Sequence, residues 1–146
     1  MTAETKQTTG PIWLLAVAGL GVLWNVYGVY QYIGSFSQTK ASLMAAGMTA
    51  PQAELYLSLP AWISVVFAIG VFGGLAGSVS LLMKKAIALP FFAVSLVGYI
   101  LLFAGDYYYG IFENIPTQLV ILAVVVAVAA ALFAVTVYAK KRSLLA

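Results

Sequence analysis

Residues 59–85 read LPAWISVVFAIGVFGGLAGSVSLLMKK, and this stretch decides the fold. A proline and a tryptophan open it, an uncharged apolar run follows, and two lysines end it. Helices in lipid associate by close packing of small residues, because no hydrophobic drive acts between them. We therefore expect a membrane-spanning helix that other helices approach closely, within the chain, in a second copy, or both. Four glycines at three- and four-residue spacings would form these contacts: Gly70, Gly73, Gly74 and Gly77.

The composition indicates a membrane protein. Of the 146 residues, 64% are hydrophobic and 8% are charged, whereas soluble domains carry about 25% charged residues. Cysteine and histidine are absent, which removes disulfides, histidine-ligated haem, most zinc sites and the commonest general base. The sequence shows no nucleophile–base pair, carboxylate dyad or phosphate-binding loop. We therefore expect no enzyme activity, no cofactor and no metal.

Four uncharged apolar runs are long enough to cross a membrane, which takes about 20 helical residues. The first could be a signal peptide, but it is too long and no small-residue cleavage site follows it. The polar residues 1–10 before it are expected to be a disordered lead. The sequence thus predicts a single integral membrane domain, an all-α four-helix transmembrane bundle, with spans at about 12–33, 60–83, 86–105 and 116–139.

The longest loop, residues 34–59, contains a candidate surface helix. Thr49 suits the N-cap position and Pro51 the first turn. Ala53, Tyr56 and Leu57 then fall on one side of the helix. We expect a short amphipathic helix lying on the membrane surface; a plain loop is the alternative.

A shorter loop is expected over residues 105–114, between the third and fourth spans; an extension of the third span to Tyr109 is the alternative. It carries Asp106, Glu113 and three consecutive tyrosines at 107–109. The tyrosines suit the aromatic belt of a membrane interface, or the lining of an outer vestibule. Since all four carboxylates of the chain then lie outside the apolar runs, we expect no acidic group inside the bundle.

Asn25 is the most informative polar residue within a span. It precedes Ile33 by eight residues, which places it about 12 Å from the outer end of an ideal helix. An amide facing lipid is costly, so Asn25 should face the bundle interior, where Ser95 and Tyr99 share its depth. One interpretation is an interhelical hydrogen bond that stabilises the bundle. The other is a candidate polar site for a small solute, formed by Asn25, Gln31, Ser95 and Tyr99.

Two sequence blocks resemble a known family. The first joins Trp24-Asn25 to Gly28 and Tyr32, and the second runs from Pro60 to Ser78. Together they resemble a family of small four-span bacterial inner-membrane proteins that are often labelled sugar transporters. The resemblance covers roughly residues 20–100 and implies a four-span fold and a bacterial inner membrane.

Two functional hypotheses follow. The resemblance implies a transporter of a sugar-like or other small neutral solute, which would act as a homo-oligomer because four packed helices fill their own interior. The solute would be uncharged, since the spans offer no charge to pair with an ion. The absence of reactive groups instead favours a non-catalytic accessory or assembly subunit of a larger membrane complex. In both cases the lipid bilayer is a partner.

The basic residues predict the orientation. An even number of spans places both termini and the turn at 84–85 on one side of the membrane. Basic residues favour the cytoplasmic side, so both termini should be cytoplasmic. Because basic residues at span ends are ordinary anchors, we expect no nucleic-acid partner. Six of the seven basic residues lie on this side: Lys6, Lys84, Lys85, Lys140, Lys141 and Arg142.

Reporter fusions test this orientation. A cytoplasm-active reporter fused to the C-terminus should be active, and a periplasm-active reporter inserted near Gly110 should be active as well. Each reporter in the other position is the control and should be silent. Reversed activities would contradict the orientation and leave the four spans in place.

Overall fold

The computed structural model describes residues 11–146 and contains seven helices there, with no strand in that range. Four of them are long and apolar enough to cross a membrane. The prediction of an all-α, four-span membrane protein is therefore confirmed; the expected disordered lead, with Lys6, lies outside the described residues. The helices are α2 (Ile12–Ser35), α3 (Lys40–Ala45), α4 (Ala50–Leu57), α5 (Ala61–Leu82), α6 (Ala88–Tyr108), α7 (Ile111–Asn114) and α8 (Pro116–Lys141).

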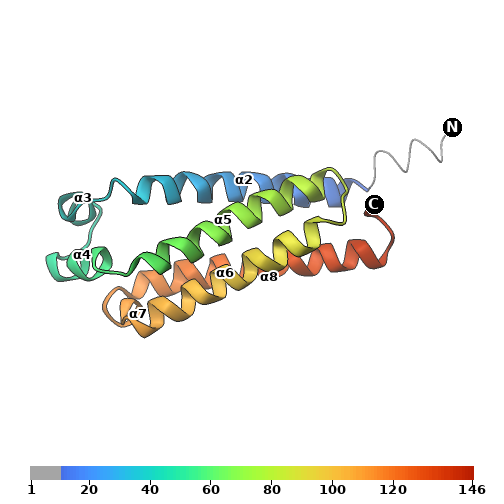
Figure 1. The fold of residues 1–146 in the computed structure, drawn as a ribbon. Helices are drawn as coiled ribbons and strands as arrows, with labels where there is room; N and C mark the ends of the chain where they lie inside the picture. Colours follow the sequence, from blue (N-terminus) through green and yellow to red (C-terminus); the bar gives the residue numbers. More distant parts are fainter. Residues whose placement is uncertain (1–10) are drawn as a thin grey trace.

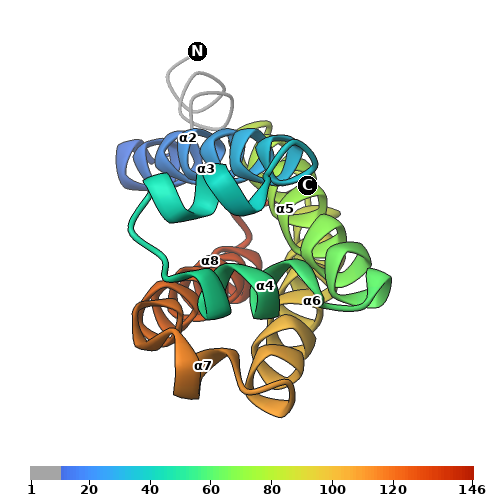
Figure 2. The same ribbon diagram turned by 90° about the vertical axis from the view of Figure 1, so that its left-hand side faces the viewer.

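The long helices pack in chain order. Helix α5 lies between α2 and α6, and α8 lies against α6 on the far side (Figure 1). Helices α2 and α8 touch over only a short stretch, so one side of the bundle is partly open. Viewed along the bundle, α3, α4 and α7 cover one end (Figure 2). We call this the cap end, and α3, α4 and α7 together the cap.

The opposite end, which we call the basic end, gathers positive charge. Five basic residues belong to the turn after α5 or to the end of α8: Lys84, Lys85, Lys140, Lys141 and Arg142. The Trp13 and Tyr138 rings stack 5.8 Å apart there and join α2 to α8. The segregation of charge matches the predicted pattern, and a cytoplasmic basic end stays a prediction.

The glycines of α5 allow its neighbours to approach closely. A Cβ atom on Gly70 would lie 2.5 Å from the Tyr99 ring, and one on Gly77 would lie 2.9 Å from Phe92. At Gly73 the Ser95 Cβ is 3.2 Å away, and at Gly74 a Cβ would overlap the Asn25 side-chain oxygen. Gly70, Gly73 and Gly77 thus face α6, and Gly74 faces the Asn25 side chain of α2. The glycines serve packing within the chain; a role in a dimer stays a prediction.

The loop between α2 and α5 contains the expected helix. The Thr49 hydroxyl caps α4 by accepting a hydrogen bond from the backbone N–H of Gln52, and Pro51 lies in the first turn, as the sequence predicts. Ala53 is fully buried against the bundle, whereas Leu57 is 44% exposed. The side-chain Nε2 of Gln52 donates to the Asn114 backbone carbonyl at 2.7 Å and links α4 to α7. Helix α4 crosses the end of the bundle (Figure 2), and its position on the membrane surface stays a prediction.

The predicted loop at 105–114 is largely helical. Helix α6 continues to Tyr108, and the single turn of α7 fills Ile111–Asn114. Gly105 packs against Ile63 and Trp62 of α5, and this contact supports the extra turn. Gly110, with φ of 76°, provides the left-handed residue between the two helices. Asp106 therefore lies on a helix and is buried, so the expectation that no acidic group enters the bundle is wrong.

The substitution Gly74→Ala tests the close packing of α5. The new methyl group would collide with the Asn25 side chain, and overpacking of this kind costs about 1–3 kcal/mol. We expect a lower midpoint of thermal unfolding in detergent. Gly19→Ala is the matched control, because no atom lies within 4 Å of a Cβ at Gly19. Equal midpoints for the two variants would contradict the packing argument.

Candidate functional site

The Asn25 amide joins α2 to α5. Its Nδ2 donates to the Gly21 carbonyl at 2.8 Å and to the Ser78 hydroxyl oxygen at 3.2 Å. Its Oδ1 rests against Gly74, which has no side chain to exclude it. The residue is buried. Because an amide nitrogen has two protons to donate, both donors of Asn25 are used inside the bundle.

Ser95 and Tyr99 approach the same part of α5 from α6. The Ser95 hydroxyl donates to the Gly70 carbonyl at 2.6 Å. The Tyr99 ring covers Gly70, one turn nearer the cap end. Both residues are buried. The structure thus places three of the four candidate site residues, Asn25, Ser95 and Tyr99, around Gly70 and Gly74.

The fourth candidate, Gln31, does not join them. Its side chain is exposed, and its Nε2 donates to the Tyr27 hydroxyl at 2.7 Å on the surface of α2. Gln31 lies six residues beyond Asn25, about 9 Å along the helix. A site that combines Gln31 with Asn25 is therefore not formed within the described chain.

The contacts of the polar residues indicate what the cluster does. Both Asn25 donors and the Ser95 hydroxyl bond to groups of the bundle itself. Interhelical bonds of this kind stabilise membrane bundles. The geometry therefore favours a stabilising role for Asn25 and Ser95; binding of a solute there stays a prediction.

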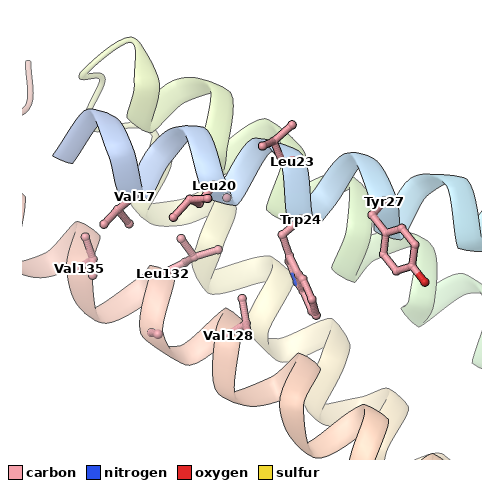
Figure 3. A pocket seen from close by; sticks show the side chains of 10 residues that line it. Val17, Leu20, Leu23, Trp24, Tyr27, Val128, Leu132 and Val135 are labelled. Carbon is pink, nitrogen blue, oxygen red and sulfur yellow. The ribbon is translucent and has the colours of Figure 1, made fainter. Parts of the chain in front are cut away.

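A groove opens between α2 and α8, where the two helices diverge toward the cap end (Figure 3). Its volume is about 640 Å³. Trp24 lines this groove, while its neighbour Asn25 points into the bundle. Gly21 belongs both to the groove and to the Asn25 hydrogen-bond cluster. The lining is almost wholly apolar and comes from Val17, Leu20, Gly21, Leu23, Trp24, Tyr27, Val128, Ala131, Leu132 and Val135.

Asp106 forms a second polar position, beneath the cap. It is 4% exposed, and its Oδ1 is buried without a hydrogen-bond partner among residues 11–146. Burial raises the pKa of the Tyr56 phenol on α4, and the nearby charge of Asp106 raises that pKa further. Asp106 lies in the last turn of α6, at the cap end of the bundle.

The sequence does carry a signal for Asp106. The buried positions of α6 recur at three- and four-residue steps, and Asp106 continues that series toward the cap end. The predicted end of the third span at residue 105 left Asp106 outside this pattern. The series is Ser95, Gly98, Tyr99, Leu102, Gly105 and Asp106.

No protein-family model, curated protein or solved structure matches this chain. The resemblance based on Trp24-Asn25 and Pro60–Ser78 therefore stays a prediction, together with the sugar-transporter label that it carries. The functional argument rests on the geometry of the groove and of the two buried polar positions.

Replacing Asn25 tests whether the buried amide stabilises the bundle. Asn25→Ala removes two hydrogen bonds, and a buried interhelical bond contributes about 0.6–1.7 kcal/mol. We expect a measurable loss of stability on denaturant titration in mixed micelles. Gln31→Ala is the control on the same helix and should change stability by less than about 0.5 kcal/mol, as an exposed substitution usually does. Equal effects of the two variants would contradict the assigned role.

Proposed function

We propose that the protein is a non-catalytic subunit of a larger membrane complex, in a bacterial inner membrane, with its basic end in the cytoplasm. The observation that carries this proposal is the groove between α2 and α8. It lies on the lateral face of the bundle, where a neighbouring transmembrane helix would pass. The partner's helix contributes apolar side chains that fill the groove.

The residues of the groove suit a helix partner. Gly21 and Ala131 are small, and small residues let a second helix come close in lipid. Trp24 and Tyr27 supply large rings at the edge, and such residues often dominate the energy of an interface. Leu20 and Leu23, which also line the groove, are largely exposed and offer further apolar surface to a partner. An unfilled groove loses dispersion contacts along its lining, so a well-fitted helix gains them.

The interior of the bundle supports a non-catalytic role. Asn25 and Ser95 donate to groups of the bundle itself, and Thr136 donates to the Leu132 carbonyl at 2.7 Å. Donors engaged in this way are not free to act on a substrate. A supporting subunit needs a stable apolar body and a docking surface, and both are present here.

One observation favours a second candidate, transport of a sugar-like or other small neutral solute by a homo-oligomer. Gly21 lies on the groove, and a Cβ on Gly21 would lie 2.8 Å from the Ser78 hydroxyl. Only the Gly21 backbone therefore separates the groove from the Asn25–Ser78 pair. A second copy packed across the groove would enclose a space beside these polar groups.

Blocking the groove tests the proposed subunit role. Ala131→Trp places a large ring in the groove, whereas Ala130→Trp places the same ring on an exposed position of α8 outside the groove lining. We expect tagged parent and Ala130→Trp to retain the same membrane protein on purification from native membranes, measured by quantitative mass spectrometry. Ala131→Trp should retain at least about tenfold less, which corresponds to about 1.4 kcal/mol.

Two outcomes would contradict the subunit role. One is partner-free purification of the parent from native membranes in a mild detergent. The other is equal retention of the partner by both tryptophan variants. Uptake of labelled neutral solutes by liposomes containing the parent, reduced by Ala131→Trp but not by Ala130→Trp, would favour transport instead. Co-purification of two differently tagged copies would support the homo-oligomer that transport requires.

A further inference from the structure

The carboxyl group of Asp106 is the least satisfied buried polar group in the part of the chain that the structure describes. Its Oδ1 is buried and has no hydrogen-bond partner there. Asp106 lies in the last turn of α6, where unpaired backbone carbonyls give the helix a partial negative charge. Helix α6 therefore does not stabilise a carboxylate at this position. Burial of such a charge without a partner costs several kcal/mol in proteins.

Among residues 11–146, no basic side chain is placed to neutralise Asp106. Lys40 is the one basic residue between positions 7 and 83, and its Nζ lies 2.5 Å from the Glu54 carboxylate. The next basic residues, Lys84 and Lys85, are at the basic end, about 27 Å away along α6. The carboxyl of Asp106 is therefore compatible with the closed cap as a neutral acid.

We propose that Asp106 is a proton-binding site that controls the cap. While Asp106 holds a proton, α3, α4 and α7 stay packed over the end of the bundle. Release of the proton leaves a buried charge, and the cap opens so that water can solvate it. The proton comes from the water at the cap end and returns to it. This inference concerns a different part of the molecule from the groove and does not depend on the proposed subunit role.

Asp106 is the residue that titrates, because the titratable groups around it are neutral, paired or exposed. Helix α5 contains no titratable side chain. On α4, Tyr56 has a raised pKa and stays neutral, while Glu54 is exposed and paired with Lys40. Glu113 of α7 is exposed, as are Tyr107 and Tyr108 of α6. The hydroxyl of the half-buried Tyr109 accepts from the Trp62 indole N–H at 3.3 Å. Helix α8 has no titratable group before Tyr138, which is at the basic end.

Polar contacts hold the helices of the cap to one another: the Gln52 side-chain amide of α4 donates to the Asn114 carbonyl of α7, and Lys40 of α3 pairs with Glu54 of α4. The cap packs on the bundle through apolar side chains, to which α4 contributes Ala53, Leu55 and Tyr56. An unpaired buried charge costs several kcal/mol, which is enough to offset a few apolar contacts.

Hydrogen exchange of α4 tests the proposal on the full chain in lipid nanodiscs. The reporters are the Ala53 and Ser58 amides, which donate to the Thr49 and Glu54 carbonyls. They lose protection when the cap opens, because an eight-residue helix is not stable in water without its packing. Protection is expressed relative to unstructured peptide at the same pH. Between about pH 4 and pH 9, the protection of the parent should fall as pH rises, by up to about tenfold per unit, because the closed cap binds one proton more than the open cap.

The substitution Asp106→Asn should abolish this dependence, because the amide stays neutral and keeps the cap closed at high pH. Glu113→Gln is the matched control and should behave like the parent. Protection of the parent that does not change with pH overturns the proposal, and so does an Asp106→Asn variant that follows the parent.

Discussion

The close approach of α2 and α6 to the glycine face of α5 is the constraint on which the structure depends. Asn25 can reach Ser78 only because Gly74 leaves room for its amide oxygen. Likewise, Tyr99 can pack on Gly70 and Ser95 on Gly73 only because these glycines have no side chain. Van der Waals contact and hydrogen bonds hold helices together in lipid. Because α2 and α6 occupy the surface of α5, α8 packs mainly on α6. The groove between α2 and α8 is the consequence of that arrangement.

The features that the sequence predicted are those with a local cause. Each span needs a minimum apolar length, so all four were found with ends within three residues of α2, α5, α6 and α8. The caps of α4 follow from short-range hydrogen bonds of Thr49. The spacing of Gly70, Gly73, Gly74 and Gly77 predicted close packing, and the depth of Asn25 along its helix brought Ser95 and Tyr99 to the same level.

The features that were missed depend on contacts between distant segments. Ala53 is buried because α4 crosses the end of the bundle, and no local pattern encodes that crossing. Gln31 stays on the surface because Tyr27, four residues earlier, offers it a partner there. Asp106 enters the buried face of α6 because Gly105 packs against Ile63 and Trp62 and extends the helix. The groove requires the relative tilt of two helices that are far apart in sequence.

The buried polar groups differ in whether they have a hydrogen-bond partner, and this difference separates the structural groups from a functional one. Asn25 and Thr136 donate to the carbonyl four residues earlier, and Ser95 donates to a carbonyl of α5. Packed helices offer acceptors, so a buried donor is readily satisfied. An ionised carboxylate is an acceptor only, and the last turn of α6 adds further unpaired acceptors. Protonation converts Asp106 into a donor and removes its charge. Within residues 11–146, the buried side chain that lacks a hydrogen-bond partner is therefore one whose charge a proton can remove.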